Sequence, residues 1–139
     1  MDARFRFSSD PADLDHDRVH AWLSEQSYWA LGRPRETQER AIEGSLNYAV
    51  VDTATGRQVG YARVVSDRAT FAWLCDVFVD PSVRGLGVGV GLIDGVVAEL
   101  DALGLRRTVL STRDAHGLYA KFGFAPLDGS PCWMVRGAG

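Results

Sequence analysis

Residues 77–92 read VFVDPSVRGLGVGVGL, and this order of residue types predicts a buried strand, a sharp turn, a glycine-rich loop and then a helix. Asp80 and Pro81 end the strand, because proline has no amide hydrogen to give to a β-ladder. Glycines let the loop backbone come within hydrogen-bonding distance of a ligand, since no Cβ stands in the way. The free amides and the positive dipole end of the following helix favour a phosphate group. The stretch therefore predicts a phosphate-binding loop, with Arg84 placed just ahead of the helix to supply positive charge.

Two common phosphate-binding motifs do not fit this loop. A Walker A loop needs Gly-Lys-Ser/Thr after its glycines, and the sequence lacks that tripeptide. A GxGxxG motif counted from either of the first two loop glycines meets Val90 or Leu92 where its third glycine should stand. The pattern that fits is Arg-x-x-Gly-x-Gly, formed by Arg84, Gly87 and Gly89.

This strand, loop and helix resemble the coenzyme A signature of the GNAT family of N-acetyltransferases. In that family, amides of the loop bind the pyrophosphate of coenzyme A. The resemblance implies an acetyl-CoA co-substrate, held by the end of the strand and by the loop. The positions implied are Val77, Phe78, Val79, Arg84, Gly85, Leu86, Gly87, Val88 and Gly89.

A second segment, residues 112–124 with the sequence TRDAHGLYAKFGF, resembles the closing motif of the same family. There, an Asn is followed by Ala, then by Leu-Tyr, and then by Gly-Phe. Thr112 stands at the Asn position and is implied to bind the pantetheine arm through its hydroxyl. The matching positions are Ala115, Leu118, Tyr119, Gly123 and Phe124.

The whole chain predicts a single domain over residues 1–139, of the α+β class, around one mixed sheet. Hydrophobic periodicity and turn residues predict the order β-α-α-β-β-β-α-β-α-β, which agrees with the GNAT fold. The predicted strands are residues 4–7, 46–52, 58–66, 70–79, 107–111 and 133–135, and the predicted helices are residues 15–26, 34–44, 87–104 and 115–122.

The resemblance implies a direct transfer of the acetyl group to a primary amine, with Tyr119 as the donor of a proton to the departing thiolate. His116 precedes Tyr119 by one helical turn, so the two side chains are neighbours. His116 either tunes the phenol or contacts substrate, and a place on the surface is an equal alternative.

The general base is harder to assign. Many family members place a Glu or His at the position of Trp73, whose indole cannot accept a proton. Asp76 is the charged residue of this strand, and a buried carboxylate needs a partner or a function. Asp76 acts as base, directly or through water, or anchors neighbouring backbone, and the anchoring role is favoured. Strand alternation predicts that it faces the side opposite Trp73, Cys75 and Val77.

The acceptor is expected to enter near residues 27–33, between the first two helices. Tyr28 and Trp29 are adjacent aromatic residues in a loop, where full exposure is costly. With Trp22 and Trp73, which the expected fold places nearby, they predict an aromatic-walled pocket for a small amine with an apolar body. The amine belongs to a small molecule or a peptide, and its identity is open.

Composition narrows the remaining classes. A net charge of −3 without a basic stripe argues against a nucleic-acid partner, and so against acetylation of aminoacyl-tRNA. The N-terminal residues lack the apolar core of a signal peptide, and no apolar run reaches membrane-spanning length, so we expect a cytoplasmic protein away from membranes. Cys75 and Cys132 stand singly and predict no disulfide, and the pair His16 and His20 lacks further ligands for a metal. A homodimer is left open.

The alternative function is a non-catalytic acyl-CoA-binding regulatory module, because Trp73 occupies the usual place of a base.

Overall fold

The protein is built around one five-stranded sheet, with the strands in the order β1-β2-β3-β4-β5. The computed structural model describes residues 1–127, 132 and 134–137. Neighbouring strands run antiparallel except β4 and β5, which are parallel, so the predicted mixed sheet is confirmed. The strands are β1 (Phe5–Ser8), β2 (Leu46–Asp52), β3 (Arg57–Ser66), β4 (Phe71–Val79) and β5 (Arg107–Val109).

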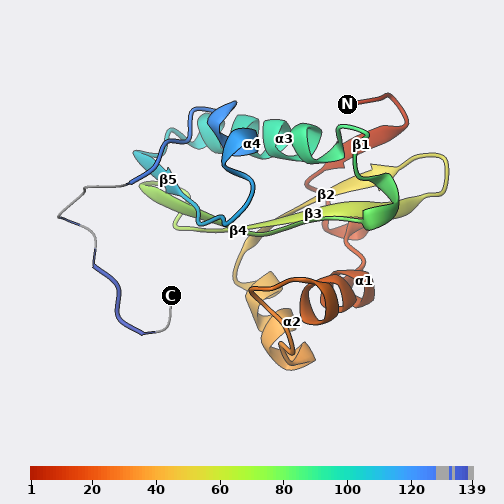
Figure 1. Ribbon diagram of the computed structural model, residues 1–139, viewed down its shortest axis with the longest axis horizontal. Helices are drawn as coiled ribbons and strands as arrows, with labels where there is room; N and C mark the ends of the chain where they lie inside the picture. The colour runs from red at the N-terminus through yellow and green to blue at the C-terminus, as the bar shows by residue number, and fades with distance from the viewer. Residues whose placement is uncertain (128–131, 133, 138–139) are drawn as a thin grey trace.

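Helices cover both faces of the sheet. Figure 1 shows α3 and α4 above the sheet and α1 and α2 below it. A π-helical turn, Trp22–Gln26, continues α1, and 3-10 turns precede α1 and follow β4 at Pro11–Asp13 and Pro81–Val83. The helices are α1 (His16–Ala21), α2 (Arg35–Glu43), α3 (Val88–Leu103) and α4 (His116–Ala120). Within the described ranges, no helix has the length and apolarity needed to cross a bilayer.

The upper core lies between α3 and the sheet. Residues of α3 spaced by three or four, as a helix periodicity requires, are buried there. They pack against Val50, Val64 and Leu74 from three neighbouring strands. The buried residues of α3 are Val88, Leu92, Ile93, Val96 and Leu100.

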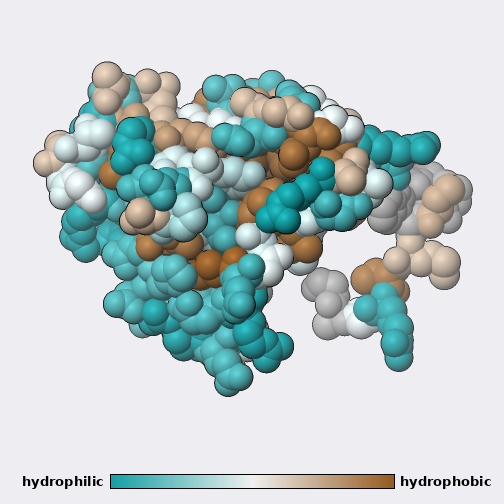
Figure 2. Space-filling view, turned by 180° about the vertical axis from the view of Figure 1, so that it is seen from behind, coloured by the Kyte–Doolittle hydropathy of each residue, from teal (hydrophilic) through white to brown (hydrophobic). Residues whose placement is uncertain are grey.

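The lower core lies between the sheet and the α1 segment. Val19, Trp22 and Leu23 are buried against Tyr61 of β3 and Phe78 of β4. The outer surface of this lower layer is mostly hydrophilic, and hydrophobic residues show along the seam where it meets the sheet (Figure 2). The predicted amphipathic helix over residues 15–26 is therefore present as α1 and its π-helical turn.

The predicted last strand differs from the rest. Trp133 lies outside the described residues, while Met134 and Val135 are in neither helix nor strand. The fifth strand is also shorter than predicted, because β5 ends at Val109 instead of position 111. The chain leaves the sheet there, and this early departure shapes the site.

Candidate active site

The edge of β4 is open along its second half. β5 pairs with β4 over three residues, from Phe71 opposite Arg107 to Trp73 opposite Val109. Within the described chain, residues 74–79 of β4 continue without a β5 partner. A strand edge carries backbone N–H and C=O groups that need partners. The edge can therefore accept an extended ligand between β4 and the segment that leads to α4.

The glycine-rich loop stands at the end of this open edge. Gly85 and Gly87 have φ of +83° and +82°, a left-handed conformation that side chains other than glycine rarely adopt. Gly87 is the N-cap of α3 and provides no side-chain cap, so the first amides of a sixteen-residue helix keep their hydrogen-bonding capacity. This geometry can bind an anion.

Arg84 fixes the loop to the strand. Its Nε donates to the carbonyl oxygen of Val79 at 3.1 Å, and its guanidinium lies 5.3 Å from the centroid of the Phe78 ring. The side chain forms no ion pair with any carboxylate of the described residues. Its positive charge is therefore available to a ligand at the loop.

Asp80, between β4 and the loop, ties the loop to α1. Its Oδ1 accepts hydrogen bonds from the amide and the hydroxyl of Ser82, at 2.9 and 2.6 Å. Its Oδ2 accepts from Arg18 Nη2 at 2.9 Å and from Trp22 Nε1 at 3.1 Å. Burial raises the pKa of Asp80, but these donors outweigh burial and lower it overall.

A β-bulge in β4 decides where Asp76 points. Tyr61 pairs with Phe78 and Arg63 pairs with Cys75, so two residues of β4 stand opposite one residue of β3. Asp76 has a φ of +51°, and its carboxylate bonds Arg63, the cross-strand partner of Cys75. It therefore shares its face with Cys75. The prediction that Asp76 faces away from Trp73 and Cys75 is wrong here, because the bulge interrupts the alternation. Val77 packs against the core on the α3 side, so the predicted opposite faces of Asp76 and Val77 are confirmed.

Asp76 is enclosed by donors. Its side chain is buried, with a residue exposure of 4%, and Oδ2 accepts from Arg33 Nη1 at 2.7 Å and from Arg63 Nε at 2.8 Å. Oδ1 accepts from Trp29 Nε1 at 2.9 Å. Burial raises the pKa of Asp76, but the hydrogen bonds and charges of the two arginines lower it overall. Asp76 thus links β4 to β3 and to the loop between α1 and α2.

The predicted aromatic residues remain partly open to solvent: Tyr28 is 45%, Trp29 42% and Trp73 43% exposed. Tyr28 packs edge-on against Trp29, with 4.9 Å between ring centroids. The guanidinium of Arg113, from the segment between β5 and α4, lies 4.4 Å from the centroid of Tyr28. Segments that flank the open edge therefore meet at Tyr28. Trp73 lies where β4 and β5 stop pairing.

Tyr119 lies in α4 and is 8% exposed, packed edge-on to Phe124. Burial, with smaller contributions from the nearby Tyr28 and Asp114, raises the pKa of Tyr119 to about 12. None of the hydrogen bonds among the described residues uses its phenol. His116 is the exposed first residue of α4, and Thr112 Oγ1 accepts from the Ala115 amide at 3.1 Å.

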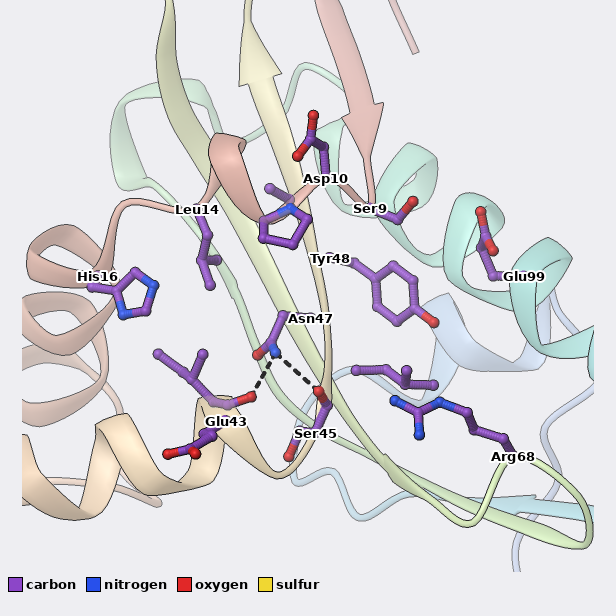
Figure 3. Close-up of a pocket in the computed structure, with 14 residues that line it drawn as sticks. Ser9, Asp10, Leu14, His16, Glu43, Ser45, Asn47, Tyr48, Arg68 and Glu99 are labelled. Atoms are coloured by element: carbon purple, nitrogen blue, oxygen red, sulfur yellow. Dashed lines mark hydrogen bonds between the residues drawn. The ribbon is translucent and has the colours of Figure 1, made fainter.

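A separate hollow lies at the edge of β2 where β1 ends. Figure 3 shows it between His16 and Glu43 on one side and Tyr48 and Glu99 on the other, and its volume is about 510 Å³. None of the predicted site residues lines it. No group of three potential metal ligands occurs among the described residues either. Contacts instead join Asp76 of β4 to Trp29, Trp29 to Tyr28, and Tyr28 to Arg113.

Comparison with known proteins agrees with this geometry. A family model described as the acetyltransferase (GNAT) family matches residues 16–124, which include the loop, the open edge of β4 and α4. The chain belongs to the GNAT family of acetyltransferases. The sequence resemblance is thereby confirmed.

Three known proteins are similar to this GNAT domain in sequence or structure. A crystal structure of a GNAT-family protein from Xanthomonas campestris is 46% identical, with a TM-score of 0.88, and the match covers 96% of this chain and 93% of that one. The chloroplastic serotonin N-acetyltransferase 2 of Oryza sativa subsp. japonica is 35% identical over 102 residues, which are 68% of this chain and 51% of the rice protein. This chain thus spans about half the length of the rice relative. A GNAT-family acetyltransferase from Streptococcus pneumoniae, 22% identical with a TM-score of 0.72, covering 97% of this chain and 98% of that one, shows the shared fold.

Several residues that shape this GNAT site were missed by sequence reasoning. Their partners are distant in sequence, such as Arg18 with Asp80, 62 residues apart. A long-range ion pair leaves no local pattern that could reveal it. Asp76 was the residue whose sequence position indicated such partners. An acid in an apolar strand requires hydrogen-bond or ion-pair partners from elsewhere in the chain. The residues missed are Arg18, Arg33, Arg63 and Arg113. Trp22, expected near the acceptor pocket, is instead buried and donates to Asp80.

Proposed function

We propose that this GNAT protein transfers the acetyl group of acetyl-CoA directly to a primary amine of a small molecule or a peptide. The observation that carries the proposal is that a loop suited to an anion directly follows an unpaired strand edge. The uncapped start of α3 comes one short turn after the half of β4 that lacks a β5 partner among the described residues, and Tyr119 packs in the same core cluster as Val88 of α3 and Val79 of β4. An elongated ligand with a phosphate end and a reactive end suits this arrangement.

The pyrophosphate of acetyl-CoA is assigned to residues 84–89 of the loop, and the pantetheine arm to Val77, Phe78, Val79 and Thr112. Glycine geometry supports the loop. Gly87 needs its positive φ, whereas a Cβ at Gly89 would meet Val79 and Leu118 only at ordinary contact distances of 3.7 and 4.0 Å. Packing within the protein therefore does not demand a glycine at position 89. The close approach of a ligand would account for it.

The transfer needs a neutral amine, a donor for the oxyanion and a proton for the leaving thiolate. The amine nitrogen attacks the thioester carbonyl, the C–S bond breaks, and the sulfur takes the phenolic proton of Tyr119. The new amide nitrogen releases its extra proton to water, which restores the phenol through solvent. N–H groups of the open β4 edge are suited to the oxyanion. We assign Asp76 the anchoring role, because a carboxylate already bonded by two arginines and an indole is a weak base.

The acceptor side is assigned to Tyr28, Trp29, Trp73 and His116. Three half-exposed rings near the open edge suit an amine with an apolar or aromatic body. The name of the rice relative indicates an arylalkylamine substrate for that protein. We extend this class to the present chain as a proposal, and it makes arylalkylamines the first acceptors to test.

Cofactor binding tests the loop assignment. Gly87→Asp puts a side chain and a negative charge where the pyrophosphate would lie. Gly56→Asp is a matched control, because Gly56 also has a positive φ and open surroundings, but lies in the turn between β2 and β3. Acetyl-CoA should raise the melting temperature of the wild type and of Gly56→Asp, and leave that of Gly87→Asp unchanged. Equal stabilisation of all three proteins would contradict the loop assignment.

Turnover tests the reaction itself. Release of free thiol from acetyl-CoA is followed with arylalkylamines, aliphatic amines and peptide N-termini as acceptors. Amine-dependent thiol release together with the acetylated amine in mass spectrometry is the expected result. Cofactor binding without thiol release for any amine would support the non-catalytic module instead.

A further inference from the structure

Two aspartates of β4 and its end, Asp76 and Asp80, are held in the same way. Each accepts a hydrogen bond from an indole N–H and at least one from an arginine of the segment 18–33. This segment runs from α1 to the start of α2 and will be called the clamp segment. The two aspartates stand at different functional places, one beside the acceptor loop and one at the cofactor loop.

The first clamp acts on the cofactor loop. Trp22 Nε1 and Arg18 Nη2 hold Oδ2 of Asp80, while Oδ1 of the same carboxylate holds the amide and hydroxyl of Ser82. Arg18 is fixed in turn by the carbonyl oxygen of Gln58 at 2.7 Å. The carboxylate therefore cannot rotate without releasing Ser82, which begins the turn into residues 84–89.

The second clamp acts on the acceptor loop. Trp29 Nε1 and Arg33 hold Asp76, and Arg63 holds the same carboxylate from β3. Trp29 carries Tyr28 edge-on against its ring. The position of both aromatic rings over the sheet is therefore set through Asp76.

Hydrogen bonds inside the clamp segment hold the backbone between Trp22 and Trp29. Loss of the bond at one aspartate should therefore leave the bond at the other aspartate in place. Ser24 Oγ donates to the His20 carbonyl at 2.6 Å, and Ser27 Oγ donates to the Leu23 carbonyl at 2.7 Å. The amide of Ala30 donates to Ser27 Oγ at 3.0 Å. These bonds hold the connection between the indoles independently of either aspartate.

We propose that Trp22 and Trp29 are positioning residues with separate targets: Trp22 sets the cofactor loop through Asp80, and Trp29 sets the acceptor wall through Asp76. The inference rests on the proposed function and deepens it. Neither residue takes part in proton transfer. Trp22 acts through Asp80. The ring of Trp29 belongs to the acceptor wall, and its N–H holds that ring in place through Asp76.

The test uses Trp22→Phe and Trp29→Phe, which keep an aromatic ring and remove the N–H. Loss of a hydrogen bond to a charged group corresponds to a change of roughly 10- to 150-fold in an equilibrium constant. Because each indole acts on the ligand only through its aspartate, we expect a part of this effect, an increase of about three- to tenfold in the affected constant. Trp22→Phe should raise the dissociation constant of acetyl-CoA, measured by titration calorimetry, and leave the KM of the best amine within about twofold. Trp29→Phe should raise the KM of the best amine and leave the dissociation constant of acetyl-CoA within about twofold. A melting curve of each variant separates these effects from general destabilisation.

A second pair guards against loss of folding, because Trp22 is buried against Phe78. Arg18 and Arg33 are partly exposed, so Arg18→Gln and Arg33→Gln disturb the core less. Arg18→Gln should repeat the pattern of Trp22→Phe, and Arg33→Gln that of Trp29→Phe. Variants of both pairs that shift the same constant, or neither constant, overturn the inference while wild-type activity stands. A wild type that neither binds acetyl-CoA nor acetylates an amine overturns the proposed function and the inference with it.

Discussion

At the scale of single residues, Tyr119 combines burial with a free phenol. Its pKa of about 12 keeps the phenol protonated across the pH range in which proteins usually work. A coenzyme A thiolate resembles a cysteine thiolate, whose conjugate acid has a pKa of about 8.5. Proton transfer from phenol to a fully formed thiolate is therefore uphill. Tyr119 therefore helps mainly by donating a hydrogen bond to the negative charge that develops on sulfur, and the transfer of its proton is completed at a cost. Its contribution should be modest.

We predict that Tyr119→Phe lowers turnover about 10- to 100-fold, below the range of about 10²–10⁴ common for positioned acids. The ring is kept, so stability should change little, and the dissociation constant of acetyl-CoA should stay within a few-fold. This is the pattern of an interaction made in the transition state. Turnover and cofactor affinity are measured side by side with the best amine. An unchanged turnover would assign Tyr119 to the core alone.

At the scale of elements, the sequence predicts what local patterns encode. The buried stripe of α3 follows from apolar residues at helical spacing, and its end follows from Gly104, which has a φ of +67°. The bulge at Asp76 could not be predicted, because its positive φ is stabilised by donors from three distant positions. The same holds for the Asp80 clamp. Residues with local partners were found, and residues whose partners lie across the sheet were not.

Glycines on helices also illustrate the element scale. A Cβ on Gly95 would overlap the ring of Phe7, so β1 can approach α3 only because position 95 has no side chain. We predict that Gly95→Ala destabilises the protein by about 1–3 kcal/mol, the usual cost of overpacking. Gly117→Ala is the matched control, because a Cβ on Gly117 of α4 meets nothing, and it should gain about 0.5–1 kcal/mol. Denaturant unfolding of both variants measures the difference, and equal stabilities would exclude tight packing at Gly95.

At the scale of the whole molecule, buried or half-buried ion pairs join segments that are far apart in the chain. Arg4 pairs with Asp52, Arg18 with Asp80, and Arg33 with Asp76. Hydrogen bonding by Arg4 lowers the pKa of Asp52, and for the other two acids the donors outweigh the opposing effect of burial. A carboxyl group whose pKa is lower in the folded state than in the unfolded state stabilises the folded protein at pH values above the unfolded-state pKa, which is about 3.9 for aspartate.

That stability is lost as pH falls through the folded pKa values, so we predict a steep decrease of the melting temperature below about pH 4. Asp80→Asn should lower the melting temperature at neutral pH and flatten its acid dependence. Asp94→Asn serves as control, because Asp94 is exposed on α3 and in no ion pair with the described residues. Thermal melts from pH 7 to pH 3 give the slope of melting temperature against pH for each variant and for the wild type. An acid slope in Asp80→Asn as steep as that of the wild type would contradict the prediction.

The clamp segment has a consequence for the construction of chimeras, in which this segment is replaced by that of another family member. The clamp segment lies within the stretch of chain between β1 and β2, so it could be cut out and replaced without interrupting β4, the loop or α3. A grafted segment would nevertheless arrive without partners for Asp76 and Asp80. Such a chimera must carry over the two indoles and their arginines, or replace both aspartates. Otherwise a change meant for acceptor choice would disturb the grip on the coenzyme as well.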